Sequence, residues 1–333
     1  MKKLTQPTGR AGILALIGAA AVLPLLFSGY PYFVLVCDYI LIYLIAVSGF
    51  DVLVGFSGQM SMGHAAYYCL GAYGSALLHQ YTHLPVLVTM VIAAILTTLI
   101  GALIAWPTTK LVAHFMSLAT IAFGNIVYQL ANNSPGRITG NANGMHTDYL
   151  SLFGFELNTY TKFYYFALAA TLLFLLLKHQ LLHSRVGRAM LAIRENDHAA
   201  NGMGVNVRFY KISAFAISTF YTAFAGAMYA HLVRYISPDA FKQTVSVMFL
   251  IMLLFGGMSS MVGPVIGVTA VTLLNEALRS ASSDKMLVYG IILLVVILVF
   301  PGGLLGIFRD LKERVAGRKA AREGKAGADN AGY

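Results

Sequence analysis

Charged residues are scarce in this sequence. Of its 333 residues, 11% are charged and 58% are hydrophobic, and only 13 are acidic. Soluble domains average about a quarter charged residues, so a water-soluble fold could not bury this much apolar surface. Transmembrane β-barrels show alternating segments of about ten residues, whereas the apolar runs here are long and continuous. The composition therefore predicts an all-α fold, a polytopic integral membrane helical bundle.

The sequence also has few cysteines and lacks the motifs of catalysis. Its two cysteines, Cys37 and Cys69, lie in apolar segments without disulfide spacing or a nearby cluster of metal-ligating residues, so we expect both to be buried. There is no nucleophile with a base at usable spacing, no HExxH and no GxxxxGK[ST] phosphate loop. We therefore predict no catalytic residue, no metal site and no bound cofactor, and a protein that is not an enzyme.

The net charge of +10 is distributed between and after the apolar runs. Basic residues precede the first run, recur in the polar segment 179–211 and form a tail from Arg309 onward. This is the positive-inside pattern of membrane proteins. A nucleic-acid-binding protein would need a water-exposed domain, and no segment is long enough to form one. We expect contact with membrane lipid and not with nucleic acid.

Ten apolar runs approach the roughly 20 residues that cross a bilayer. They lie near 11–29, 32–54, 84–106, 162–178, 212–233, 244–262, 264–280 and 285–303, with two polar-flecked runs at 60–79 and 111–131. If all ten cross, both termini and the basic loop lie on one side, and the loop 132–160 lies opposite. We expect about eight to ten membrane segments, some broken or re-entrant, with cytoplasmic termini in a bacterial inner membrane. The first run lacks a convincing cleavage site and is expected to be retained.

Polar and small residues interrupt the apolar sequence between residues 55 and 64. The candidates here are Gly55, Gly58, Gln59, Ser61, Gly63 and His64. Unpaired backbone is tolerated at membrane depth only where protein or a water-filled cavity satisfies it, so this stretch is a candidate for a solute path, with a helix beginning near Gly63. An ordinary turn followed by a small-residue packing helix is the alternative. His64 is either a relay or ligand or, more simply, a buried hydrogen-bonded histidine.

A second interruption, Thr139 to Gly144, follows the polar-flecked run that contains Asn125. Its path candidates are Asn125, Gly140, Asn143 and Gly144. Amides in such a segment either bond neighbouring helices or line a cavity. Two interrupted segments at corresponding positions suggest a pore-forming core.

The hydrophilic stretch 184–206 has the pattern of a short helix, a turn and a second short helix. Apolar residues recur at helical spacing from Val186 to Ile193, Asn196 or Asp197 can cap the second helix, and Gly202 and Gly204 can end it. Such an amphipathic pair suits the groove of a soluble partner. A solvated loop or an interfacial helix on anionic lipid is the alternative.

These motifs resemble a known family. GRAMLAIRENDHAANGMGVN resembles the coupling segment of ABC importer permeases, and specifically of the branched-chain amino acid (LivM/LivH-type) family. FDVLVGFSGQMSMGHAAYYCLGAYGSALL, ITGNANGM, LLFGGMSSMVGPVIG and FPGGLLGIF are similar to further segments of that family, nearest to its LivM-type members. The resemblance extends from about residue 32 to 308. It implies one transmembrane permease domain over 1–308, followed by a basic cytoplasmic tail over 309–333. The composition of this tail predicts that it is partly disordered.

The resemblance also implies partners and roles. It implies a second, LivH-like permease subunit, two cytoplasmic ATP-binding subunits that use ATP and Mg²⁺, and a periplasmic amino-acid-binding protein. In the coupling segment, residues expected to seat the loop in the ATPase groove are Gly187, Arg188, Arg194, Glu195, Ala199, Ala200 and Gly204. Two positions depart from the family pattern. Asn141 replaces a glycine of the TGG-like segment, and Asn201 replaces an acidic residue of the coupling segment.

Several functions remain open on the sequence. By resemblance the substrate is a branched-chain amino acid, namely leucine, isoleucine or valine, while urea, short amides or other amino acids are alternatives within the related permeases. An ion-coupled secondary transporter is the alternative from another class, and it would favour ionisable residues inside the membrane. The candidates for such residues are Asp38, Asp51, Glu276 and Arg279. We expect all four near helix ends or turns, where water and headgroups can satisfy them, in structural or topological roles.

Overall fold

The structure is a computed structural model of the chain. It describes residue 18 and residues 20–24, 29–111, 113–152, 155–278 and 290–291. The basic tail 309–333 and most of the predicted runs 11–29 and 285–303 lie outside the described residues. The prediction of a single domain over 1–308 is therefore followed below only within the described residues.

Five helices of the described chain are long and apolar enough to cross a membrane. They are α2 (Pro31–Asp51), which continues through the π-helical turn η1 (Val52–Phe56), α4 (Val86–Thr108), α6 (Tyr160–His183), α9 (Val207–Val233), and η4 (Pro238–Phe241) together with α10 (Gln243–Gly256). The other helices are α3 (His64–Thr82), α5 (Ala113–Asn132), α7 (Arg185–Glu195), α8 (Asp197–Gly202) and α11 (Gly263–Ala277). These elements confirm the all-α membrane bundle.

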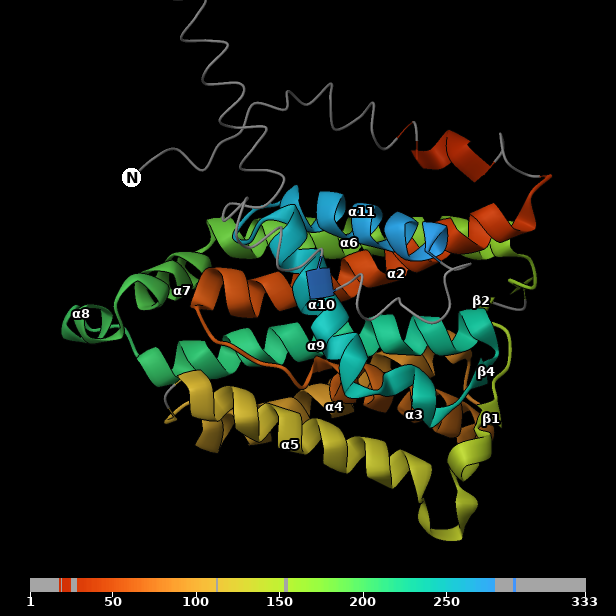
Figure 1. Cartoon of the computed structure of the whole chain (residues 1–333), viewed down its shortest axis with the longest axis horizontal. Helices are drawn as coiled ribbons and strands as arrows, with labels where there is room; N and C mark the ends of the chain where they lie inside the picture. Colours follow the sequence, from red (N-terminus) through yellow and green to blue (C-terminus); the bar gives the residue numbers. More distant parts are fainter. Residues whose placement is uncertain are drawn as a thin grey trace, which may run out of the picture.

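Helix α9 lies at the centre of the bundle. It packs against α2, α3 and α4, while α6 packs on α2 and α10 pairs with α11 (Figure 1). The core consists of apolar side chains from these helices, and Ala223, Ala225 and Ala227 of α9 are fully buried. Such small residues let membrane helices approach closely, which explains why α9 can contact several neighbours at once.

Two predicted spans are shorter than expected. The runs 244–262 and 264–280 become α10 and α11, of 14 and 15 residues, which at 1.5 Å per residue rise only about 21 to 23 Å. That is less than the roughly 30 Å of a hydrocarbon core. Gly256 ends α10, and Gly257 has a positive φ of 102°, so the chain turns at this point. Together with η4, the stretch Pro238–Gly256 has 19 residues and is long enough to cross. Helix α11 alone is shorter than a full crossing, as expected of a broken or re-entrant segment.

The two ends of the bundle differ in structure. At one end α7 and α8 project from α6 and α9, and at the other end lie short strands and 3-10 turns (Figure 1). The short elements are η2 (Pro135–Arg137), η3 (Asn141–Asn143), β1 (Met145–His146), which pairs with β4 (Tyr235–Ile236), and β2 (Ser151–Leu152), which pairs with β3 (Phe155–Glu156). The basic loop and the Asn/Gly-rich loop therefore lie at opposite ends, as predicted from charge and parity.

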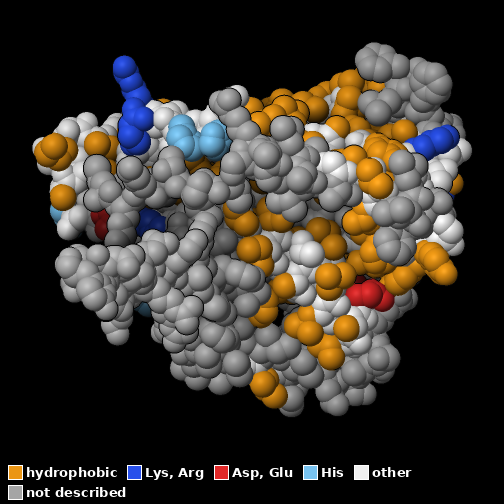
Figure 2. Space-filling view, turned by 90° about the horizontal axis from the view of Figure 1, so that it is seen from above, with side chains coloured by type: hydrophobic (Ala, Val, Ile, Leu, Met, Phe, Trp, Pro, Cys, Tyr) orange, Lys and Arg blue, Asp and Glu red, His pale blue; other side chains and the backbone are white. Residues whose placement is uncertain are grey.

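The surface has the zoning of a membrane protein. Figure 2 shows hydrophobic side chains over the middle of one face, and the charged side chains on that face lie toward its two ends. Large apolar residues such as Leu99, Leu103 and Leu176 are more than half exposed on α4 and α6. In water these side chains would form an unfavourable apolar surface, whereas in a bilayer they face lipid.

The prediction for the ionisable residues was wrong for two of them. Asp38 lies inside α2 and is fully buried, and neither of its carboxylate oxygens has a hydrogen-bond partner among the described residues. Asp51 ends α2 as expected, but it is fully buried and bonds Lys178 of α6, so it does not face water. Glu276 lies in the last turn of α11, and Arg279 lies outside the described residues.

Of the cysteines, Cys69 is buried and Cys37 half-buried, and both are free.

Candidate functional site

The coupling segment folds as a helix, a turn and a second helix. Ser184 caps α7, and its hydroxyl accepts hydrogen bonds from the backbone N–H groups of Val186 and Gly187. The Asn196 side chain accepts from the N–H of Ala199 at 3.0 Å and so caps α8. Short polar side chains at these positions satisfy the free N–H groups of a helix start. The predicted helical pair and its Asn196 cap are thus confirmed by the geometry.

One face of α7 packs tightly onto the bundle. Gly187, Met190 and Ile193 are buried, and Met190 belongs to an apolar cluster that includes Leu53 and Phe215. A Cβ on Gly187 would lie 2.5 Å from the carbonyl oxygen of Leu181, so no larger residue fits. Gly187 therefore holds α7 against the end of α6 and does not face an outside partner.

The remaining coupling candidates divide between outward and inward positions. Arg188, Glu195 and Ala199 are exposed, whereas Ala200 is buried. Gly204 has a φ of +82° and ends the segment in a left-handed turn that suits glycine. Arg194 is exposed as well, but its guanidinium reaches back to Ser259 in the loop between α10 and α11.

The first interruption connects the α7 end of the bundle to its interior. After η1 the chain is irregular from Ser57 to Gly63, and α3 begins at His64, one residue from the predicted start. Neighbouring side chains satisfy its backbone. The N–H of Met62 donates to Thr120 at 3.0 Å, and the N–H of Ala65 donates to Ser246 at 2.8 Å. Protein groups from α5 and α10 therefore compensate for the break at these two points.

Gln59 and the glycines of the interruption fit closely against neighbouring elements. The Gln59 side chain is buried and donates to Ser57 and to the carbonyl oxygen of Lys211. A Cβ on Gly63 would lie 2.2 Å from the carbonyl oxygen of Thr120, and a Cβ on Gly55 would lie 2.0 Å from the Asp51 carboxylate. Gly58 has a φ of +72°, which favours glycine.

His64 is a buried, hydrogen-bonded side chain. Its Nδ1 lies 3.1 Å from the Ser61 hydroxyl and its Nε2 lies 2.7 Å from the Ser218 hydroxyl, and its exposure is 0%. The Phe50 ring lies 4.5 Å away between centroids. Since hydroxyls can donate or accept, either neutral tautomer is satisfied. The geometry fits the simpler of the two interpretations, a structural histidine that joins α3 to α9.

The second interruption lies at the other end of the bundle. Gly140 and Gly144 have positive φ values, and a Cβ on Gly144 would lie 2.3 Å from the carbonyl oxygen of Ile236. Asn143 is exposed, and its carbonyl oxygen accepts a bond from the Tyr235 hydroxyl. The expectation that the two breaks flank one path stays a prediction.

Asn125 lies on an outward face of α5. This residue is exposed in the interior of a 20-residue helix, and Gln129 is exposed one turn later. An amide facing lipid at membrane depth is unfavourable, and such residues face protein or water. Exposed apolar residues such as Ile126 and Leu130 lie beside these amides, so the exposed surface of α5 is mixed in character.

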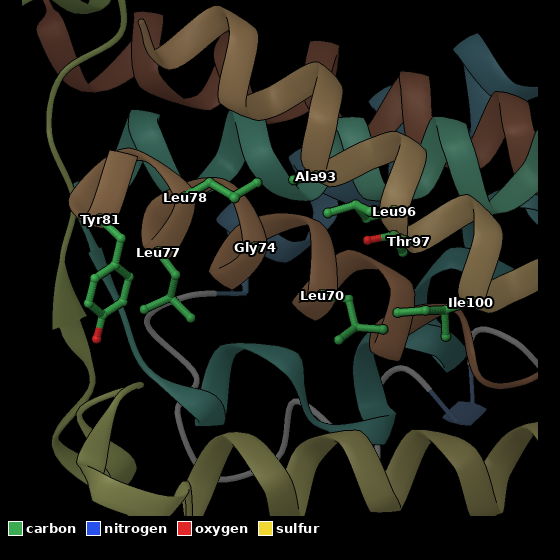
Figure 3. A pocket seen from close by; sticks show the side chains of 9 residues that line it. All are labelled: Leu70, Gly74, Leu77, Leu78, Tyr81, Ala93, Leu96, Thr97 and Ile100. Carbon is green, nitrogen blue, oxygen red and sulfur yellow. The ribbon is translucent and has the colours of Figure 1, made fainter. Parts of the chain in front are cut away.

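Two grooves on the described part of the chain lie away from these candidates. Figure 3 shows a groove of about 300 Å³ between α3 and α4, lined by Leu70, Gly74, Leu77, Leu78, Tyr81, Ala93, Leu96, Thr97 and Ile100. A second groove of about 350 Å³ lies between α4, α6 and α9. Both are almost wholly apolar, and neither is lined by a path candidate. They have the character of lipid-facing crevices, not of a solute path.

The sequence analysis missed a buried polar cluster. Asp51, Lys178 and Ser259 come from three separate segments at the α7 end of the bundle, and the Asp51 carboxylate accepts hydrogen bonds from the Lys178 ammonium and from the backbone N–H of Ser259. The signal in the sequence was a lysine at the end of an apolar run and an aspartate near the end of another. Charges in such positions are rare and are usually paired or functional.

Comparison with known proteins assigns the family. Residues 15–299 match the model of a family described as branched-chain amino acid transport system, permease component. The chain belongs to this family. It is thus a multi-pass permease component of a transport system, and this family is not a family of enzymes.

Three relatives of the permease carry matching descriptions. The chain is 30% identical over 293 residues to the high-affinity branched-chain amino acid transport system permease protein LivM of Escherichia coli K12, covering 81% of this chain and 69% of that protein. It is 29% identical, with the same coverage, to the LivM protein of Salmonella typhimurium LT2. A probable LivM of Methanocaldococcus jannaschii is 22% identical over 66% of this chain and 68% of that protein. No solved structure matches the permease.

Proposed function

We propose that this permease is a subunit of an ATP-driven importer of leucine, isoleucine and valine in a bacterial inner membrane. Its supports are the family and the names of the relatives, all of which refer to branched-chain amino acid transport. The partners in this proposal are a second, LivH-like permease, two cytoplasmic ATP-binding subunits and a periplasmic amino-acid-binding protein. This chain binds no cofactor, and ATP and Mg²⁺ are used by the partners.

The observation that carries the proposal is the α7–α8 projection. It stands at one end of the bundle, is capped at both helix starts, and is held by the buried face of α7. Arg188 and Glu195 are exposed there, seven residues apart and so on the same side of α7. A rigid, charged projection on the side of the basic loops suits a cytoplasmic ATPase groove.

The path in this proposal runs along the outward face of α5. Asn125 and Gln129 are exposed there in the interior of the helix, and in this proposal the second permease covers this face and completes a polar path. When the ATPase subunits close, the 184–206 segment moves as a rigid body, and the helices rock between inward-open and outward-open states.

The test is co-purification from detergent with a matched control. Arg188→Glu/Glu195→Arg reverses two charges on α7, and Asp239→Lys/Lys242→Asp reverses an exposed pair, 3.0 Å apart, that lies outside the coupling segment. We expect wild type and the second variant to retain an ATPase subunit and a second permease. The first variant is expected to lose the ATPase and keep the second permease.

A protein that never carries an ATPase, or an α7 reversal that keeps it bound, contradicts the coupling role and favours ion-coupled transport. Substrate is tested separately by uptake of labelled leucine into proteoliposomes that hold the assembled transporter. Competition by isoleucine and valine supports the proposed substrate. Competition by urea or acetamide in their place assigns the chain to the related amide carriers.

A further inference from the structure

The loop from Gly257 to Val262, between α10 and α11, contacts the coupling segment directly. Arg194 of α7 donates a hydrogen bond to the hydroxyl of Ser259. The same hydroxyl donates to the carbonyl oxygen of Gly55 in η1 at 2.7 Å. Arg194 also lies over Gly58, where a Cβ would come within 3.2 Å of its Cγ. The guanidinium of Arg194 is thus engaged with its own chain.

The loop is held from the interior by a buried ion pair. The N–H of Ser259 donates to Oδ1 of Asp51 at 2.8 Å, and Lys178 donates to the carbonyl oxygen of Ser260 at 3.2 Å. Lys178 Nζ and Asp51 Oδ2 are 2.8 Å apart, and both side chains are 0% exposed. A buried charge pair with further hydrogen bonds has a narrowly defined geometry. In this conformation the loop is therefore held against α2 and α6.

Ser259 is the residue that joins these contacts. Its φ is +59°, in the left-handed region that favours glycine, so its place in the loop is set by its hydrogen bonds and not by backbone preference. Next to it, α10 and α11 meet closely, since a Cβ on Gly256 would lie 1.9 Å from the carbonyl oxygen of Gly263. Movement of the loop would carry both helices.

The packing of α7 makes Arg194 separable from the rest of the segment. Helix α7 packs against α6, η1 and α9, mainly through its buried face. Arg194 is exposed and adds a contact to the loop through its long side chain. Removing its guanidinium breaks this contact and leaves the buried face of α7 in place.

We propose that Arg194 and Ser259 are positioning residues that pass movement of the coupling segment to the α10–α11 pair, with Asp51 and Lys178 as the anchor of the loop. This inference rests on the proposed function. It reassigns Arg194 from seating the ATPase to transmission within the permease. Arg188 and Glu195 remain the outward contacts, since within the described residues the guanidinium of Arg188 bonds only the adjoining end of α6, at the carbonyl oxygen of His183, and does not reach the loop.

The experiment uses the full transporter, purified with its partners, and measures hydrogen exchange of the peptide covering 257–262. Exchange is compared without nucleotide and after trapping with ATP and vanadate. In wild type the two states are expected to differ. In Arg194→Gln, Ser259→Gly and Ser259→Ala, the ATPase is expected to co-purify and the difference to vanish. Arg194→Lys, which keeps a donor, is expected to restore part of it.

The control is Ser213→Ala in α9, whose hydroxyl bonds the carbonyl oxygen of Phe209 in its own helix. This variant is expected to keep the full nucleotide-dependent difference. Using both Ser259 variants separates loss of the hydroxyl from backbone strain, because glycine relieves the positive φ and alanine does not. The readout is the difference in exchange between the two nucleotide states, not the level of exchange in either state. A merely structural role of Arg194 or Ser259 would leave this difference unchanged.

Three results overturn the inference. If Arg194→Gln loses the ATPase, Arg194 is a partner contact, and the proposed function stands without this linkage. If the variants keep the wild-type difference, or if wild type shows none, the loop does not carry the movement. If no ATPase accompanies wild type at all, the proposed function has failed and the linkage fails with it.

Discussion

Lys178 Nζ lies 2.8 Å from Oδ2 of Asp51, and neither side chain has any exposed surface. The pair joins the ends of α2 and α6 and anchors the loop between α10 and α11. Taking two charges out of water is unfavourable, so a pair of this kind persists only where the geometry and further hydrogen bonds compensate. Here the backbone groups of Ser259 and Ser260 supply those bonds.

Breaking this pair is expected to destabilise the protein strongly. Lys178→Met leaves the Asp51 carboxylate buried without its partner, and the expected loss is about 3–5 kcal/mol. Asp51→Asn/Lys178→Met removes both charges and should recover part of that loss. The measurement is thermal or denaturant unfolding in detergent. If Lys178→Met lowers the free energy of unfolding by less than about 1 kcal/mol, the range of an exposed pair, then water reaches the site and the pair is not buried.

The coupling segment shows what the sequence could predict. Its apolar spacing, its Asn196 cap and its terminal glycines are local signals, and each was found in the structure. Within the described residues, the runs 84–106 and 111–131 likewise became α4 and α5 close to their predicted bounds. Local periodicity and caps determine such elements because neighbouring residues in the chain make the contacts.

The Asp51–Lys178 pair shows what the sequence could not predict. The two residues are 127 positions apart, and only the packing of α2 on α6 brings them together. The same holds for His64 and Ser218, which are 154 positions apart. The role of Asn125 also stayed open, because in the proposed function the surface that covers the outward face of α5 belongs to another chain. A local pattern of residues in the sequence does not indicate which distant residues pair or which surfaces a partner covers.

Gly63 is expected to tolerate no side chain. Gly63→Ala places a Cβ 2.2 Å from the carbonyl oxygen of Thr120, so α3 and α5 must separate. Overpacking of this kind costs about 1–3 kcal/mol. The control is Gly202→Ala in α8, where nothing lies within 4 Å of the added Cβ, and this variant should be neutral or slightly stabilising. Equal stability of the two variants in detergent would contradict the close approach of α3 and α5.

The hydroxyl of Ser218 is expected to stabilise the fold without serving transport. Ser218→Ala leaves Nε2 of the buried His64 without its partner at 2.7 Å. An unsatisfied buried polar group costs about 1–3 kcal/mol. The control is Thr98→Ala in α4, whose hydroxyl bonds only its own helix in the described contacts. Uptake per folded transporter should match wild type in both variants, and a selective loss of uptake in Ser218→Ala would make His64 part of the path.

Asn125 is expected to affect transport and not stability. The side chain is exposed on α5, so Asn125→Ala removes no buried contact within the protomer, and unfolding in detergent should be unchanged. If the amide lines the path, it loses a hydrogen bond to solute or water worth about 1 kcal/mol, which slows uptake about fivefold. Leu103→Ala in α4 is the control, because Leu103 is 74% exposed among other apolar side chains and has the position of a lipid contact. Leucine uptake should separate the two variants. Equal uptake, with the second permease still bound, would remove the outward face of α5 from the path and leave it as a plain subunit contact.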